Sequence, residues 1–154
     1  MKIVIRRYRT GDEAQVSDLW SRASKAAHPF IPGEGEGERL RLLRDVYLVH
    51  AENWVATDAD GNVVGLLGLL STHEDAEVGG LFIAPEAQGK GIGRQLIAHA
   101  VALKGDLRLE VFARNEGARH FYRRTGFEED GSRTDPDTGF ELILLRRKRT
   151  SAPN

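Results

Sequence analysis

The chain has 154 residues, 22 Lys and Arg against 23 Asp and Glu, a formal net charge of −1, and no cysteine. This composition suits one domain with a hydrophobic core, and it excludes disulfides, cysteine nucleophiles and cysteine metal sites. The balanced charge argues against a dedicated nucleic-acid binder, and the five histidines lack the spacing of metal ligands. No apolar run approaches the ~20 residues that span a bilayer, and the first residues lack a signal-peptide core, so we expect a cytoplasmic enzyme without a metal or a membrane partner.

The N-terminal part of the chain predicts a strand followed by two helices. Residues 2–9 alternate in character and predict the strand. Thr10 to Glu13 follow the capping-box pattern, so the first helix should begin there. Residues 28–38 contain two prolines and three glycines and cannot continue a helix. A second helix is expected over residues 38–50. Its inward-facing residues are predicted to be Leu40, Leu43, Val46, Tyr47 and Val49.

An antiparallel hairpin is predicted next. Residues 53–57 and 63–71 have the composition of strands, and Asp60-Gly61-Asn62 between them tolerates the positive φ of a tight turn. The second of these strands is apolar on both faces, as expected of a central strand covered by helices. Residues 76–83 form another apolar strand. Its internal glycine pair, Gly79-Gly80, indicates a bulge or the approach of a ligand to the backbone.

A glycine-rich stretch, Gln88-Gly89-Lys90-Gly91-Ile92-Gly93, joins that strand to a helix. The first N–H groups of a helix have no internal partner, the helix dipole is positive at that end, and glycines let a phosphate approach. The spacing matches neither a Walker A loop nor a dinucleotide fingerprint, since no Ser or Thr follows Lys90 and Arg94 stands where a last glycine would be. We therefore expect a ligand that carries a phosphate or pyrophosphate.

The C-terminal part predicts a strand, a short helix and two more strands. Residues 107–112 alternate between an apolar face and a face with Arg108 and Glu110. The helix should begin at Asn115 and end at Gly126. The last strands are expected over residues 127–133 and 140–146. Residues 1–146 are predicted to form a single domain, and residues 147–154 a polar tail.

Two motifs resemble those of the GCN5-related N-acetyltransferase (GNAT) superfamily. The Q-x-x-G-x-G spacing at residues 88–93, after an apolar strand, resembles the acyl-CoA loop of that family. Further on, its motif N-x-x-A-x-x-x-Y-x-x-x-G-F is matched in this chain by Asn115, Ala118, Tyr122, Gly126 and Phe127. The strand-helix-helix beginning extends the agreement, and the chain is most similar in pattern to small stand-alone bacterial N-acetyltransferases.

The resemblance implies an α/β (α+β) fold with a mixed, mostly antiparallel sheet of six to seven strands, a central splay and about four helices. It also implies an acyl-CoA donor, with acetyl-CoA favoured by family habit. The pantetheine amides of the donor would pair with the backbone of the strand at residues 76–83, and Asn115 would lie near the pantetheine. The implied strand positions are Leu81, Phe82 and Ile83, and the implied pyrophosphate positions are Gln88, Gly89, Lys90, Gly91, Ile92, Gly93 and Arg94.

The resemblance also implies catalytic roles. Tyr122 matches the general acid of the family, and a phenol carries its proton at neutral pH and can donate it to a thiolate. Glu110 stands in an L-E-V context in which relatives place a proposed general base. Glu110 could equally form a salt bridge to Arg108 or to another neighbour, and Glu77, His73 or a water molecule are the alternative bases.

The acceptor is expected to be a primary amine of a small molecule or a peptide. His28 and Phe30 are the candidate substrate-facing residues. The acidic residues of the segment 28–38 either hint at a cationic acceptor or belong to a solvated loop that caps the next helix. A non-catalytic acyl-CoA sensor is the alternative function, although an intact Tyr122 argues against it. A toxin-like enzyme acting on aminoacyl-tRNA would need a basic surface, which the net charge does not support. Homodimers are common among relatives, but nothing in the sequence requires one.

Overall fold

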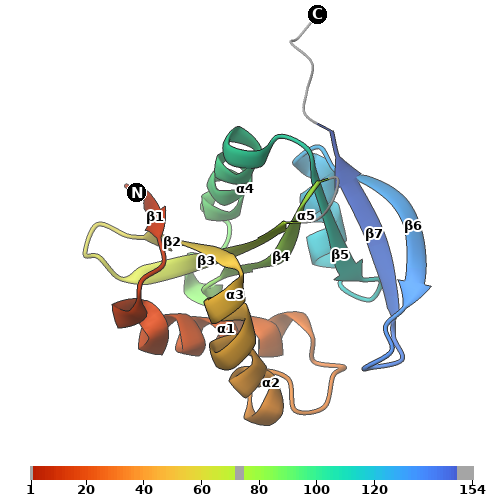
Figure 1. Cartoon of the computed structure of the whole chain (residues 1–154), viewed down its shortest axis with the longest axis horizontal. Coiled ribbons are helices and arrows are strands. Elements are labelled where there is room, and N and C mark those ends of the chain that lie inside the picture. The colour runs from red at the N-terminus through yellow and green to blue at the C-terminus, as the bar shows by residue number, and fades with distance from the viewer. Residues whose placement is uncertain (1, 72–74, 149–154) are drawn as a thin grey trace, which may run out of the picture. The chain divides into compact units, whose positions relative to one another are not determined.

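The computed structural model describes residues 2–71 and 75–148, and the predicted mixed sheet is confirmed. Seven strands form one sheet in the order β1-β2-β3-β4-β5-β7-β6 (Figure 1). Strands β4 and β5 pair in parallel, whereas β1 with β2, β2 with β3, β5 with β7, and β6 with β7 pair antiparallel. The strands are β1 (Val4–Arg7), β2 (Glu52–Thr57), β3 (Val63–Ser71), β4 (Ala76–Ile83), β5 (Leu107–Phe112), β6 (Glu128–Thr134) and β7 (Glu141–Arg147).

The helical elements match the expected number of helices. The second predicted helix is one continuous helical run made of three elements, α2, η2 and α3. The helices are α1 (Glu13–Ala27), α2 (Gly37–Leu42), α3 (Leu48–His50), α4 (Ile92–Lys104) and α5 (Glu116–Arg124). The shorter turns are η1 (Thr10–Asp12), η2 (Leu43–Tyr47) and η3 (Pro85–Ala87). Among the described residues, no helix is long and apolar enough to cross a membrane.

The chain divides into two compact units. The first comprises residues 1–69 and 79–96, and the second comprises residues 70–78 and 97–154. The first unit therefore contains β1, β2, α1 and the α2–α3 run, and the second contains β5, β6, β7 and α5. Strands β3 and β4 and helix α4 contribute residues to both units.

In the first unit, the apolar stripe of α1 is buried as its spacing predicts. Val16, Leu19, Trp20 and Ala23 lie at i, i+3, i+4 and i+7 and are each 8% exposed or less. Strand β3 is buried over its first seven residues, which confirms a central strand covered on both faces. Burying each large apolar side chain contributes about 1.5–3 kcal/mol, so this helix is held mainly by its packing.

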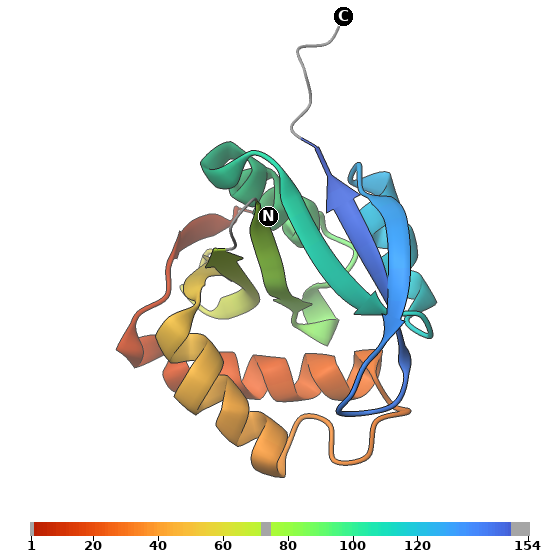
Figure 2. The same ribbon diagram turned by 45° about the vertical axis from the view of Figure 1, so that its right-hand side comes forward.

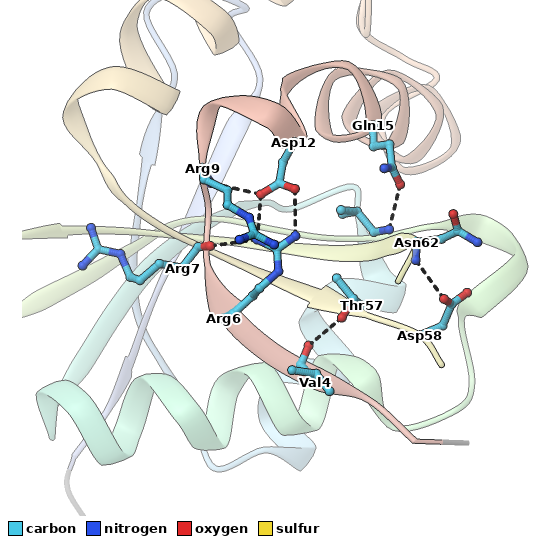
Figure 3. A network of polar contacts seen from close by, with 10 residues as sticks. Val4, Arg6, Arg7, Arg9, Asp12, Gln15, Thr57, Asp58 and Asn62 are labelled. Atoms are coloured by element: carbon cyan, nitrogen blue, oxygen red, sulfur yellow. Dashed lines mark hydrogen bonds and ion pairs between the residues drawn. The ribbon is translucent and has the colours of Figure 1, made fainter. Parts of the chain in front are cut away.

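Helix α1 does not begin with the predicted capping box at Thr10 and Glu13. The turn η1 precedes it, and the Asp12 carboxylate accepts hydrogen bonds from the Arg9 N–H at 3.0 Å and from the Arg6 guanidinium at 2.8 and 2.9 Å (Figure 3). Asp12 is only 5% exposed, and the bonds from Arg6 hold the pKa of its carboxyl below the usual range. A charge-assisted, bidentate pair is stronger than a threonine cap, which explains the difference.

The predicted inward face of the second helical run was wrong in part. Val46, Tyr47 and Val49 are 41%, 48% and 65% exposed, whereas Leu43 and Leu48 are buried. The reason is that η2 is a π-helical turn. Its i→i+5 hydrogen bonding widens the turn, so the buried position recurs after five residues instead of three or four.

In the second unit, the alternation predicted for residues 107–112 is confirmed. Leu107, Leu109 and Val111 of β5 are buried, whereas Arg108 and Glu110 are exposed. Figure 2 shows α5 against one face of the strands β5, β7 and β6. The register pairs Leu109 with Leu145 and Val111 with Ile143, so the buried face continues from β5 onto β7. The predicted tail residues 149–154 lie outside the described residues.

Candidate active site

The end of β4 is the first part of the site. Leu81, Phe82 and Ile83 are each half-buried, and the Phe82 ring meets Trp20 of α1 edge-on at 6.4 Å between ring centroids. A Cβ added to Gly80 would lie 2.7 Å from Cε2 of Phe82, so this glycine makes room for the ring. Phe82 is therefore fixed from its own strand and from α1, and the backbone of β4 at these positions is held in place.

The ladder between β4 and β5 is short. It pairs Ala76 with Leu107 and Glu77 with Arg108, and over the described residues of the two strands it contains no further pair. The N–H and C=O groups of β4 after Glu77 are therefore not used by that ladder. Extended chains commonly bind to a sheet through such unpaired backbone groups. This arrangement is the feature that the predicted central splay requires.

The glycine-rich loop has the geometry of an anion site. Gly89 and Gly91 have φ values of +79° and +81°, and a Cβ on either would meet no atom within 4 Å. The loop therefore has an open surface over its backbone. Lys90 and Arg94 are exposed, and α4 begins at Ile92, whose side chain is 1% exposed and anchors the helix. Backbone N–H groups, the positive end of a 13-residue helix and two cations thus coincide here.

The segment before the loop is also fixed. Glu86 of η3 accepts a hydrogen bond from Nη1 of Arg22 on α1 at 2.6 Å. The Gln88 side chain donates to the Ile83 carbonyl at 3.4 Å, and the Ala84 N–H donates to the Val64 carbonyl at 2.9 Å. These contacts tie the loop to the strand that it follows and to α1.

Tyr122 lies on the buried side of α5. It is 8% exposed, and its ring meets Phe121 and Phe127 edge-on at centroid distances of 5.3 and 5.4 Å. Burial raises the pKa of its hydroxyl well above the ordinary value, so the group keeps its proton at neutral pH. Asn115 caps the helix, since its Oδ1 accepts from the Ala118 N–H at 3.1 Å. Its oxygen is thus committed to α5, whereas its amide can still donate to a ligand.

The two candidate carboxylates of the second unit differ. Glu110 accepts hydrogen bonds from Nε and Nη2 of Arg133 at 2.6 and 2.8 Å, so the predicted alternative of a salt bridge to a neighbour is present. Glu77 is half-buried, and burial, followed by the nearby charge of Glu110, raises the pKa of its carboxyl. His73, the remaining side-chain candidate, lies outside the described residues.

The acidic segment that joins α1 to α2 is only partly solvated, since Glu36 is exposed whereas Glu34 is not. Glu34 is buried, and its carboxylate contacts Nδ1 of His28 at 2.9 Å and accepts from Nε of Arg39 at 2.6 Å. Burial alone would raise the pKa of Glu34, but the bonds and charges of His28 and Arg39 outweigh it and lower that pKa. Phe30 meets the His28 ring edge-on at 5.9 Å. The sequence analysis left this acidic segment either solvated or substrate-facing, and it did not predict the burial of Glu34.

Comparisons with known proteins place these features in context. Residues 50–129 match the family described as "Acetyltransferase (GNAT) domain". The chain is 35% identical over 145 residues to "Peptidyl-lysine N-acetyltransferase YjaB" of Escherichia coli strain K12, covering 94% of this chain and 95% of that protein. The solution structure of apo YjaB covers 95% of this chain and 97% of its own, with a TM-score of 0.76 and 30% identity.

Two further proteins are similar over most of the chain. "Peptidyl-lysine N-acetyltransferase YiaC" of Escherichia coli strain K12 is 34% identical over 124 residues, covering 80% of this chain and 82% of that protein. The PaiA N-acetyltransferase of Thermoplasma acidophilum, solved in complex with coenzyme A, has a TM-score of 0.77 at 20% identity, covering 96% of this chain and 99% of its own. At that identity, the likeness to PaiA concerns the fold.

Proposed function

Because the chain belongs to the GNAT acetyltransferase family and is an N-acetyltransferase, we propose that it transfers an acetyl group from acetyl-CoA to the side-chain amine of a lysine in a peptide or protein. The proposal of a lysine acceptor rests on the similarity to YjaB and YiaC over most of the chain, because both are named peptidyl-lysine N-acetyltransferases. The similarity to YjaB covers 94% of this chain, so it is not confined to the glycine-rich loop.

The donor would be held by the first unit. The pyrophosphate would be bound by the loop residues 88–94, where the open backbone at Gly89 and Gly91 gives it access and Lys90 and Arg94 supply positive charge. The half-buried residues 81–83 of β4 would pair with the pantetheine amides as an added strand does. Their N–H groups would also stabilise the oxyanion that develops on the thioester carbonyl.

The proton for the departing thiolate would come from Tyr122. The amine attacks the carbonyl carbon, a C–N bond forms, the C–S bond breaks, and coenzyme A leaves as a thiol once it has gained a proton. The burial that raises the pKa of Tyr122 keeps the phenol protonated, as this role requires. The chain contains no cysteine that could carry the acetyl group, so we propose that the amine attacks the thioester directly.

We assign the general base to Glu77 in preference to Glu110. A base must accept the proton that the ammonium group loses, and both carboxylate oxygens of Glu110 already accept hydrogen bonds from Arg133. Burial and the charge of Glu110 raise the pKa of Glu77 instead, which brings it nearer to neutral pH. Glu77 would act directly or through water, and Glu110 would act by raising its pKa.

The pH dependence of kcat/KM separates the two carboxylates. Glu77→Gln should lower kcat/KM about 10²-fold or more and remove the acidic limb of the profile. Glu110→Gln should leave most of the activity and move that limb to lower pH, because it removes a negative charge that raises the pKa of Glu77. A large loss in Glu110→Gln with a normal rate in Glu77→Gln would reverse the assignment.

The acceptor is tested with three amines at saturating acetyl-CoA, with release of coenzyme A followed by a thiol reagent. The amines are a peptide with one lysine and a blocked N-terminus, the same peptide with arginine at that position and a free N-terminus, and spermidine. The proposal predicts the highest kcat/KM for the lysine peptide. Faster turnover of the free N-terminus or of spermidine would replace the lysine proposal. Binding of acetyl-CoA without turnover of any amine would support the sensor reading.

A further inference from the structure

The segment of residues 28–36, here named the acceptor loop, is packed firmly against α1. A Cβ added to Gly35 would lie 2.7 Å from the Ser21 carbonyl oxygen and 2.8 Å from Cγ of Lys25. Only glycine at position 35, with its φ of +82°, lets the loop approach the helix this closely. Lys25 also forms an ion pair with Glu36 at 2.9 Å, on the exposed side of the loop. The acceptor loop therefore has a defined conformation.

A buried carboxylate lies at the centre of this loop. The Glu34 side chain is 4% exposed, and one oxygen contacts Nδ1 of His28 while the other accepts from Nε of Arg39. His28 is the first residue of the loop, and Arg39 is in the first turns of α2. One side chain thus ties the two ends of the segment together. Removing the charge would leave Arg39 without its ionic partner at this site, which is costly.

The acceptor loop continues from α1, the helix that contacts β4, the strand proposed to bind the pantetheine. Trp20 of α1 contacts Phe82, and Arg22 of the same helix pairs with Glu86. His28 follows Trp20 by eight residues, a rise of about 12 Å along a helix axis. A substrate amine that meets an acetyl group at β4 would have its remaining residues within reach of the loop. Both acidic residues with described side chains, Glu34 and Glu36, have cationic partners already, so the loop is not an anionic trap for an ammonium group.

We infer that Glu34 is a positioning residue, whose carboxylate holds His28 and the acceptor loop in the conformation that binds the amine acceptor. This inference rests on the proposed function. The role is distinct from direct recognition, because the carboxylate is buried and already has two partners. It explains why His28 and Phe30 keep a fixed edge-on geometry at the start of a segment that contains two prolines and two glycines.

The test compares Glu34→Gln with Glu36→Gln, the same substitution on an exposed carboxylate of the same loop. With the lysine peptide, Glu34→Gln should raise the KM for peptide about tenfold or more, because misplacing a substrate-binding element is costly. The KM for acetyl-CoA should stay within about twofold of the wild-type value, since the glycine-rich loop of residues 88–94 is separate from the acceptor loop in sequence and in contacts. Glu36→Gln should resemble wild type. An equal rise in the KM for peptide and the KM for acetyl-CoA, or no rise in either, would overturn the inference.

A second measurement does not depend on turnover. Hydrogen exchange should become faster over residues 28–39 in Glu34→Gln and stay unchanged over α4, whereas Glu36→Gln should exchange like wild type. Unchanged exchange in Glu34→Gln would overturn the positioning role even if the chain acetylated none of the amines. Combining His28→Asn with Glu34→Gln should cost less than the sum of the two single changes, since both break the contact between His28 and Glu34. Full additivity would count against a shared role.

Discussion

Replacing Tyr122 with phenylalanine removes one oxygen from the second unit and leaves its packing unchanged. The ring is 8% exposed and lies between Phe121 and Phe127 at edge-on distances that phenylalanine can reproduce. The substitution should therefore alter chemistry far more than folding. It removes the only group of this side chain that can protonate a thiolate.

The expected magnitude follows from the role. Loss of a positioned general acid lowers kcat about 10²–10⁴-fold, which corresponds to about 3–5 kcal/mol of transition-state stabilisation. Loss of one hydroxyl should lower the free energy of unfolding by about 1 kcal/mol or less, because the ring stays packed. Since burial raises the pKa of Tyr122 above its ordinary value of 10.0, the wild-type profile should show no basic limb from this residue below about pH 10.

The assay is release of coenzyme A at saturating acetyl-CoA and peptide, and the absence of cysteine makes the protein silent toward the thiol reagent. Tyr47→Phe is the matched control, because Tyr47 is 48% exposed and lies on η2. It should turn over like wild type. A Tyr122→Phe variant that keeps more than about a third of kcat, under conditions where chemistry limits the rate, would refute the general-acid role. If Tyr122→Phe lowered both the free energy of unfolding and the affinity for coenzyme A, the residue would be assigned to packing instead.

Two further changes test the proposed pyrophosphate loop, residues 88–94, and the start of α1. Gly89→Ala should weaken binding of coenzyme A about tenfold in calorimetry, because a side chain at φ +79° strains the loop and covers its backbone. Gly61→Ala is the control: with φ +83° in the hairpin turn, it should cost the same ~1 kcal/mol of stability as Gly89→Ala but leave binding unchanged. Equal affinities in the two variants would argue against the anion site. Asp12→Asn should lower the free energy of unfolding by about 2 kcal/mol in urea titrations, since it breaks a partly buried, charge-assisted bidentate pair. Asp18→Asn, which breaks an exposed pair with Arg22, should cost only about 0.3–0.5 kcal/mol, and a similar cost for both would contradict this reasoning.

Much of the fold could be predicted because its signals are local. The apolar run of β3, the glycines at positions 89 and 91, and the cap at Asn115 each express the preference of a short stretch of chain. The glycine-rich loop is the clearest case, since positive φ values and the start of α4 coincide where the glycine spacing placed them.

Other features could not be predicted because they depend on partners distant in sequence or on geometry without a periodic signature. The π turn at Leu43–Tyr47 turns Val46 outward, although the pattern reads as an ordinary helix. The pair between Glu110 and Arg133 depends on the register of β6, which shifts between Glu129 and Ser132. Such shifts cannot be read from alternation alone.

The most direct test of the central claim is to find where the acetyl group goes. The protein is incubated with acetyl-CoA carrying a ¹³C-labelled acetyl group and with a peptide that has both a free N-terminus and one lysine, and the product is fragmented in a mass spectrometer. We predict that the label lies on the lysine side-chain nitrogen and that one coenzyme A thiol is released for each label. Label on the N-terminal nitrogen alone, or no label on the peptide from protein that binds coenzyme A, would contradict the proposed acceptor.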